Sequence, residues 1–357
     1  MNSKAFTNIE MNVLSTNSNS SSIHDLSCLP FHNSHNVPVS LHVNNSIHTS
    51  GTISKIAQND CFNNYDRSHL SEIDPDNNYI NDRMLPDTQY FDENSFKNNY
   101  RKCDHFSIFL HNMRSLPDHF RELTCYLDIL DFNFKVLAFT ETWLKSYHTN
   151  FTIQNYKIEQ DNREGNIRGG GVCLYLHTNL QYKLRNDLKL AQKVFKQGSK
   201  SQNKEINSIF VEILKGSTGT KHNIIVGCIY RPPCYPLSEF NDLLSDMLDK
   251  LQTENKHVYI TGDFNCNILS SNQYTERFKN IFSANHFFPL INKPTRITLH
   301  SKTLIDNIYC NISNISTNIN AGLLNVNIAD HKGVFCINNK VQPSIKKKRE
   351  TKTRVLQ

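Results

Sequence analysis

Apolar residues recur in short runs between residues 106 and 337, and polar turn residues separate these runs. The runs are rich in β-branched and aromatic side chains, which is typical of buried strands. They cover residues 106–110, 136–140, 169–176, 208–214, 224–230, 257–261, 304–310 and 333–337. Helical patterns alternate with them, so the sequence predicts a mixed α/β domain in which about 230 residues share one core.

Three segments between these strands have the apolar spacing of amphipathic helices. The first contains Pro117 in its opening turn, where a missing N–H is tolerated. Ser238 is the predicted N-cap of the second, whose apolar face spans residues 240–251. Residues 274–287 form the third predicted helix.

Residues 1–100 have a different composition. Asn and Ser make up about a third of them, and their apolar side chains show no sustained period of a strand or a helix. We therefore expect a low-complexity, mostly disordered arm. Cys28, His32 and His35 lack a fourth ligand at a standard zinc spacing, so we do not expect a metal site there.

The rest of the composition points to an intracellular protein. No apolar run approaches the 18 or so residues of a membrane helix, and the first residues contain no apolar signal segment. The ten cysteines include no C-x-x-C pair, and several lie within apolar strands. We expect no contact with a membrane.

The formal charge of +6 is unevenly distributed. Residues 1–100 carry 5 basic and 11 acidic side chains, whereas residues 346–357 carry 6 basic and 1 acidic. The remaining residues therefore have a net charge of +7, which suits a polyanionic partner.

Polar side chains that could take part in catalysis or binding follow the predicted strands. They are Asn112, Glu141, Tyr230, Asp263, Asn265, Asp306, Asp330 and His331. Loops at the edge of a sheet often hold catalytic groups on a rigid scaffold. Each residue also has a simpler explanation: an asparagine caps turns, a tyrosine packs in a core, and a lone histidine is often structural. Only the eight residues together, in their order along the chain, favour a functional site over these simpler explanations.

Eight short motifs in this order resemble the endonuclease/exonuclease/phosphatase superfamily, and specifically the apurinic-type endonuclease domain of non-LTR retrotransposons. They are N-x-R-S (112–115), E-T-W-L (141–144), R-G-G-G-V (168–172), Y-R-P-P (230–233), G-D-F-N (262–265), P-T-R (294–296), L-I-D-x-I (304–308) and D-H (330–331). The resemblance covers residues 105–340 and implies a four-layered α/β sandwich, in which helices flank two packed mixed sheets. Residues 341–357 would be a basic tail.

The resemblance implies Mg²⁺-dependent hydrolysis of a DNA phosphodiester, leaving a 3′-OH and a 5′-phosphate. Glu141, Asn112 and Asp330 would hold the Mg²⁺, for which Mn²⁺ could substitute. Arg114 and Arg231, which lie in two of the motifs, would bind the substrate.

The resemblance also assigns the catalytic roles. Asp263 would orient or deprotonate the attacking water, and Asn265 would position that water. His331 would stabilise the transition state, with Asp306 holding its tautomer. Tyr230 would donate a hydrogen bond to a phosphate oxygen.

The resemblance further suggests partners and a place of action. DNA is the expected substrate, a reverse transcriptase encoded downstream and the element RNA are possible partners, and the nucleus is the expected place of action. Lys189, Lys193 and Lys196 share one face of a helical pattern, which predicts a phosphate-contacting loop or else a solvated insertion.

Two other functions stay open at this point. One is another phosphoesterase of the superfamily, such as an abasic-site repair nuclease or a lipid or inositol phosphate phosphatase. The other is a retroelement remnant that binds nucleic acid without cleaving it.

Overall fold

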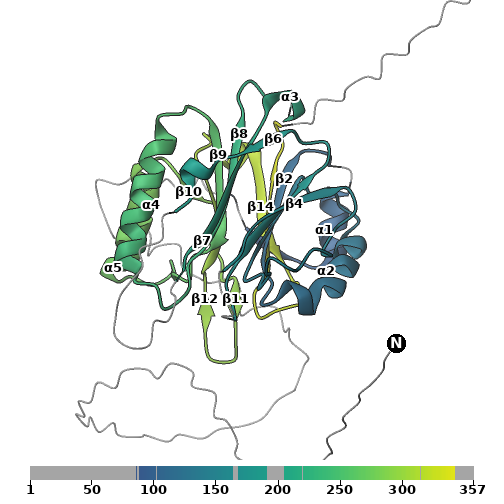
Figure 1. Cartoon of the computed structure of the whole chain (residues 1–357), viewed down its shortest axis with the longest axis horizontal. Coiled ribbons are helices and arrows are strands. Elements are labelled where there is room, and N and C mark those ends of the chain that lie inside the picture. The colour runs from purple at the N-terminus through teal and green to yellow at the C-terminus, as the bar shows by residue number, and fades with distance from the viewer. Residues whose placement is uncertain are drawn as a thin grey trace, which may run out of the picture. The chain divides into compact units, whose positions relative to one another are not determined.

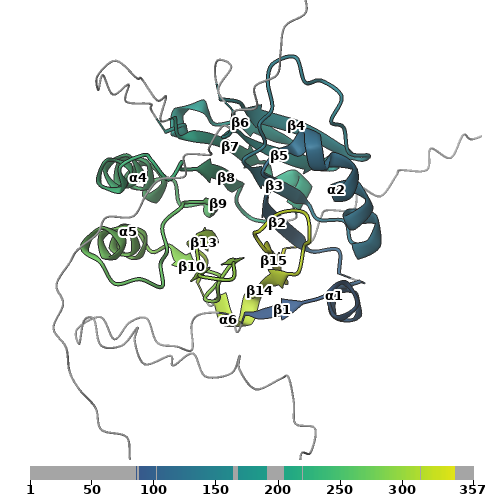
Figure 2. The same ribbon diagram turned by 90° about the horizontal axis from the view of Figure 1, so that it is seen from below.

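The computed structural model describes residues 86, 88–101, 103–163, 168–190, 205–218, 220–313 and 315–341. These residues form two large mixed sheets with helices on their outer faces (Figure 1). Viewed from below, the two sheets pack against each other, with α4 and α5 on one side and α1 and α2 on the other (Figure 2). The predicted four-layered α/β sandwich is therefore confirmed.

The first sheet has seven strands in the order β1-β14-β15-β2-β3-β5-β4. Their bounds are β1 Gln89–Phe91, β2 Phe106–Asn112, β3 Val136–Thr140, β4 Tyr156–Asp161, β5 Val172–His177, β14 Ile319–Leu324 and β15 Gly333–Asn338. The pairs β2·β3 and β1·β14 are parallel, and the other neighbours are antiparallel.

The second sheet has six strands in the order β10-β13-β9-β8-β7-β6. Their bounds are β6 Tyr182–Leu184, β7 Asn207–Ile213, β8 Ile224–Tyr230, β9 His257–Asp263, β10 Phe288–Pro289 and β13 Asp306–Cys310. Only β8 and β9 pair in parallel. A separate hairpin of β11 (Arg296–Ile297) and β12 (Lys302–Thr303) projects beyond the sheets (Figure 1).

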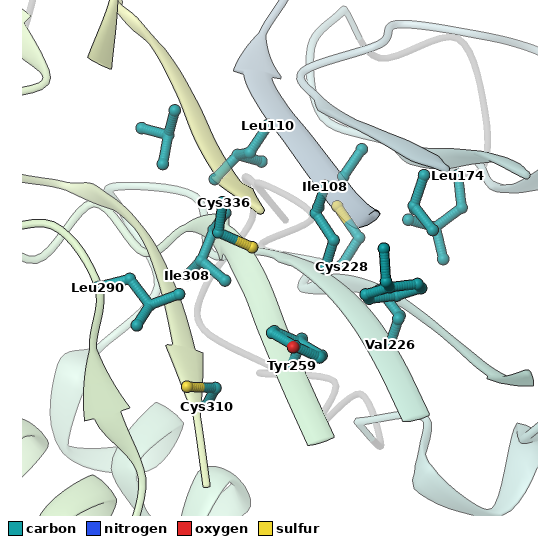
Figure 3. Close-up of a cluster of buried hydrophobic side chains, with 14 of the residues drawn as sticks. Ile108, Leu110, Leu174, Val226, Cys228, Tyr259, Leu290, Ile308, Cys310 and Cys336 are labelled. Atoms are coloured by element: carbon teal, nitrogen blue, oxygen red, sulfur yellow. The ribbon is translucent and has the colours of Figure 1, made fainter. Parts of the chain in front are cut away.

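The central core lies between the two sheets. Ile108 and Leu174 from the first sheet lie in one buried cluster with Val226 and Ile308 from the second (Figure 3). Because the strands are also covered by helices on their outer faces, β2, β7 and β8 are buried along their whole length. This explains why they appear in the sequence as nearly continuous apolar runs.

The helices cover the outer faces of the sheets. They are α1 Glu93–Tyr100, α2 Leu116–Leu130, α4 Leu237–Gln252 and α5 Gln273–Ala284, with the short elements α3 Lys215–Thr218, α6 Ile315–Asn318 and η2 Asn186–Leu188. Phe96 of α1 and Leu123 of α2 share a buried cluster with Phe109 of the first sheet. Leu244 of α4 and Phe278 of α5 pack similarly against the second sheet.

The predicted helices are present, with shifted ends. α2 carries Pro117 in its first turn and is capped by Ser115, whose hydroxyl accepts a hydrogen bond from Asp118 N at 3.3 Å. α4 begins at Leu237 rather than after Ser238, since Pro236 occupies the cap position. The third helix ends at Ala284, earlier than expected.

The folded part begins earlier than the predicted boundary at residue 100. β1 and α1 lie within the last residues of the expected arm, and the side chain of Phe96 is completely buried. The Phe96 ring lies 5.0 Å from the ring of Phe335 in β15. Residues 1–85 and 342–357 lie outside the described residues, so the expected arm and basic tail are not described there.

The lysine-rich segment is described only in part. Lys189 follows η2, and its Nζ lies 2.6 Å from Asp161 Oδ1, so this lysine is held in an ion pair. Lys193 and Lys196 lie outside the described residues. Within the described ranges, no helix is both long and apolar enough to pass through a membrane.

Candidate active site

The predicted site residues leave the two sheets at neighbouring strand ends. Asn112 is the last residue of β2 and pairs in register with Thr140, the last residue of β3, so Glu141 follows at the same edge. In the second sheet, Asp263 ends β9 and is in register with Tyr230 of β8 and Asp306 of β13. The strand pairing thus gathers these residues although up to 194 positions separate them in the sequence.

Asp263 is held between the two sheets. Asn112 Nδ2 donates to Asp263 Oδ2 at 2.8 Å, and the backbone N–H of Asn265 donates to Oδ1 at 2.9 Å. The carboxylate is 1% exposed. Burial raises the pKa of Asp263 above its ordinary value, and the nearby charge of Asp306 raises it further. The geometry therefore places a proton-accepting group beside the ends of both sheets.

His331 and Asp306 form a buried pair next to Asp263. His331 Nδ1 lies 2.8 Å from Asp306 Oδ2, which also accepts a hydrogen bond of 2.7 Å from the Thr295 hydroxyl. Burial alone would lower the pKa of His331, but the carboxylates, Asp306 first among them, outweigh it and raise the pKa to about 9. The pair fixes the orientation of the ring, and Nε2 lies 3.9 Å from Asp330 Oδ1.

Glu141 occupies the opposite side of the site. Tyr230 Oη donates to Glu141 Oε1 at 2.7 Å, and Trp143 Nε1 donates to Oε2 at 3.1 Å. Glu141 and Trp143 both have positive φ angles, of 49° and 53°. Such conformations cost energy in non-glycine residues and concentrate at functional sites. Burial raises the pKa of Tyr230, so the phenol stays protonated and remains a donor.

Asp330 is engaged by arginines. Arg296 donates to Asp330 Oδ2 from Nε at 2.8 Å and from Nη2 at 2.7 Å. Arg114 Nη1 lies 3.7 Å from Asp330 Oδ1, and the Arg114 side chain is 63% exposed. Arg296 also forms a β-bridge with His331. The base of the β11–β12 hairpin therefore joins the site through Asp330 and His331.

Arg231, a predicted substrate-binding residue, is directed into the protein and holds a loop. Its side chain is buried, and the guanidinium donates to the backbone carbonyls of Phe264 at 2.6 Å, Asn265 at 2.6 Å, Pro232 and Tyr235. These bonds use four of the five N–H donors of the guanidinium internally, and one Nη2 hydrogen is left. Arg231 instead fixes the loop after β9, and its own carbonyl accepts a hydrogen bond from Asn265 Nδ2 at 2.9 Å.

The donor chemistry of the site fits a hard divalent cation. Asp263, Asp306 and His331 bring ligand atoms within 4.8 Å of one another, a different set from the predicted ligands Glu141, Asn112 and Asp330. Asp306 Oδ1 is buried without a hydrogen-bond partner among the described residues, which is costly unless a cation or proton compensates it. Asn112 Oδ1 accepts only the Arg114 backbone N–H, at 3.1 Å, among the described hydrogen bonds. Carboxylate and amide oxygens are the ligands that Mg²⁺ prefers.

The sequence-based argument missed Thr295, Arg296 and Trp143, although all three lie within the motifs that it singled out. Thr295 Oγ1 also accepts the backbone N–H groups of Ile305, at 3.2 Å, and Asp306, at 3.1 Å. A threonine between Pro294 and Arg296 has no distinctive pattern of its own. Only the fold brings it against the buried carboxylate.

The order of the strands and the four layers define a fold that the chain shares with a solved AP endonuclease. The AP endonuclease LMAP from Leishmania major is 11% identical, with a TM-score of 0.52, and the match covers 73% of this chain and 95% of that chain.

Two further solved structures are similar at lower scores. The endonuclease domain of TRAS1, a telomere-specific non-LTR retrotransposon, is 12% identical, with a TM-score of 0.49 and coverage of 65% of this chain and 98% of that chain. An endonuclease/exonuclease/phosphatase family protein from Leptotrichia buccalis is 13% identical, with a TM-score of 0.45 and coverage of 65% and 99%. No protein-family model and no curated protein matches the chain.

Proposed function

We propose that the protein is a divalent-metal-dependent endonuclease that hydrolyses DNA phosphodiester bonds and leaves a 3′-OH and a 5′-phosphate. The observation that carries this proposal is the juxtaposition of two buried pairs. Asn112 holds Asp263 across the sheets, and Asp306 holds His331 beside it. This supplies an oriented proton acceptor and an oriented imidazole next to each other at one site.

Asp263 activates the attacking water in this proposal. Its two oxygens are oriented by Asn112 and the Asn265 backbone, so the carboxylate is positioned before the substrate arrives. Asn265 positions the water and the phosphate. The imidazole of His331 presents Nε2 to the phosphate oxygens, where negative charge accumulates, and Asp306 keeps Nδ1 protonated. Tyr230 lies beside Glu141, and its single hydroxyl hydrogen would turn from Glu141 to a phosphate oxygen when the substrate binds.

Glu141, Asn112 and Asp330 are the residues proposed to hold Mg²⁺, with Mn²⁺ as a substitute. A bound Mg²⁺ would neutralise charge on the phosphate oxygens. Tyr230 and Trp143 fix both oxygens of Glu141, and this holds the proposed ligand in place. Asp330 is paired with Arg296 and Arg114, which balance its charge and extend the positive surface toward the hairpin.

DNA is the proposed substrate because a polyanion matches the charge of the domain. The residues between 101 and 345 have a net formal charge of +7, and Arg114 lies exposed at the site. The proposal extends to nicking of a target site whose 3′-OH primes reverse transcription. A reverse transcriptase and the element RNA would then be partners, and the nucleus would be the place of action.

A substrate panel tests this function. The full chain is incubated with supercoiled plasmid, an abasic duplex, sphingomyelin vesicles and an inositol phosphate, each with Mg²⁺, with Mn²⁺ or with EDTA. We expect nicking of the intact plasmid that EDTA abolishes and Mg²⁺ restores. Preferential hydrolysis of the abasic duplex would indicate a repair nuclease. Preferential release of phosphocholine from the sphingomyelin, or of phosphate from the inositol phosphate, would contradict a DNA substrate.

A further inference from the structure

A turn of three glycines lies beside the Glu141 side of the site. Gly169, Gly170 and Gly171 have φ angles of 97°, 74° and 85°, which favour glycine strongly. The backbone N–H of Trp143 donates to Gly170 O at 2.9 Å, and that of Thr142 donates to Gly171 O at 3.3 Å. The turn is therefore fixed against the loop that carries Glu141.

Arg163 lies against this turn with its charge poorly compensated. The residue is 9% exposed, and the described residues include no carboxylate in an ion pair with it. Nη2 donates weakly to Glu205 O at 3.4 Å, and Nε is buried without a hydrogen-bond partner. A buried cation whose donors are only partly satisfied destabilises a fold unless something compensates its charge. Packing alone therefore does not explain an arginine at this buried position.

The glycines leave room for the guanidinium. A Cβ on Gly170 would lie 2.7 Å from Arg163 Nε and 2.8 Å from its Cζ, so any side chain there would displace the group. A Cβ on Gly169 would lie 3.6 Å from Arg163 Nη1 and 3.8 Å from Trp143 Nε1. Arg163 and the indole nitrogen thus border the same space, and that nitrogen already donates to Glu141.

A second cation and the indole ring complete this surface. The guanidinium carbon of Arg168 lies 4.6 Å from the centroid of the Trp143 ring, in a cation–π contact. Arg168 is exposed, so it can meet a ligand from solvent. Two arginines therefore flank Trp143, one buried and one exposed, next to a proposed metal ligand.

We propose that Arg163, Arg168 and Trp143 form a phosphate-binding subsite for the DNA strand that flanks the cleaved bond on the Glu141 side. The inference rests on the proposed function and deepens it by naming a second point of contact with the substrate. Arg163 binds a backbone phosphate from beneath the triglycine turn, because its planar donors match phosphate oxygens. Arg168 contacts the neighbouring phosphate, or it stays stacked on the Trp143 ring and packs against the DNA strand.

The experiment compares Arg163→Met and Arg168→Gln with Arg277→Met, which removes an exposed arginine on α5. Trp143 is the only tryptophan, so its fluorescence reports binding of a 20-base-pair duplex in EDTA. We expect Arg163→Met to weaken binding by about tenfold and to reduce the salt slope by about one. Plasmid nicking by the same variant should show a raised KM with little change in kcat.

Arg168→Gln and one further variant, Arg163→Lys, guard against a folding artefact. Arg168→Gln alters only an exposed side chain and should also reduce the salt slope. Arg163→Lys keeps the charge and should recover part of the affinity lost in Arg163→Met. The unfolding midpoint of each variant, followed by circular dichroism, shows whether it is folded.

The outcomes separate the two proposals. If the wild type nicks DNA but Arg163→Met and Arg168→Gln keep the affinity and slope of Arg277→Met, the subsite is refuted and the nuclease function stands. If the wild type binds without nicking and both variants lose affinity, the nuclease function fails and the subsite stands. Absence of any binding by the wild type overturns both.

Discussion

Two clusters of buried charge lie in the second sheet, and they are arranged in opposite ways. Glu212 of β7 contacts Arg185 Nη1 at 3.0 Å, Lys183 Nζ at 3.3 Å and Lys256 Nζ at 2.9 Å. Asp263 of β9 instead lies beside Asp306, another buried carboxylate. One cluster surrounds an acid with cations, and the other places two acids together around one histidine.

The two clusters shift the pKa values of their carboxyl groups in opposite directions. Burial alone would raise the pKa of Glu212, but hydrogen bonds from Asn223, Lys256 and Lys183 outweigh it and lower the pKa to about 2. Burial and the charge of Asp306 both raise the pKa of Asp263. A buried charge that is surrounded by opposite charges stabilises the fold. Buried charges of the same sign lying together are typical of a functional site. We therefore expect mutations in the two clusters to affect different properties.

The largest expected effect follows from removing the imidazole of the site. His331→Asn should reduce the rate of plasmid nicking by about a thousandfold, because a preorganised group facing the phosphate is lost. Asp306→Asn should cost a similar factor because Nδ1 loses its acceptor, and the double variant should be no worse than either single one. Single-turnover kinetics provide the rates.

His286→Asn is the matched control, because His286 is exposed after α5. It should nick at the wild-type rate. Fully additive losses in the double variant would show that His331 and Asp306 act independently and would break the proposed pair.

The next largest effect concerns stability. Glu212→Gln should lower the free energy of unfolding by about 3 kcal/mol, because three cations lose the charge that compensates them. Nicking by the folded variant should keep the wild-type rate. Urea unfolding at neutral pH gives the free energy, and an unchanged value would remove the contrast between the clusters.

The pH dependence of unfolding sharpens the same contrast. The folded-state pKa of Glu212 is lowered to about 2 from an ordinary value of 4.5. Its contribution is therefore present above pH 4.5 and is lost as the pH falls toward 2. Unfolding curves between pH 6 and pH 3 should show a smaller loss of stability in Glu212→Gln than in the wild type. Parallel curves for the two proteins would contradict this assignment.

The smallest effect is expected at Thr295. Thr295→Val keeps the shape of the side chain but removes the hydroxyl that donates to Asp306 Oδ2. We expect nicking to fall by about tenfold, since the carboxylate loses one orienting bond. Thr298→Val, in the turn of the adjacent hairpin, is the matched control. A Thr295→Val rate equal to that control would remove Thr295 from the site.

Most of the strands could be predicted because bulky apolar runs fill both faces of a covered sheet. Residues 136–140 and 224–230 were predicted with the bounds that β3 and β8 have. β14 was missed because Asn320 and Gly322 interrupt its short apolar run, and α1 was missed because its sequence is mostly polar. Gly322 lies where a Cβ would approach the ring of Phe91 to 2.7 Å.

The part of the site that could be predicted consists of residues at or near the ends of predicted strands. The order of polar residues indicated that Asn112, Asp263 and His331 belong together. The strand register brings Asn112 and Asp263 to neighbouring strand ends, and His331 joins them through Asp306. The sequence did not distinguish an arginine that faces solvent from Arg231, which binds four carbonyls. That difference depends on how the loop after β9 folds back, which has no local pattern.

The most direct test of the central claim is plasmid nicking by Asp263→Asn in Mg²⁺, followed by extension of the nicks with a DNA polymerase. Asp246→Asn, on the exposed side of α4, makes the same chemical change away from the site. The account predicts that the wild type and Asp246→Asn produce nicks that the polymerase extends, and that Asp263→Asn, still folded, produces none above background. Nicking by Asp263→Asn at the wild-type rate, or wild-type nicks that cannot be extended, would contradict it.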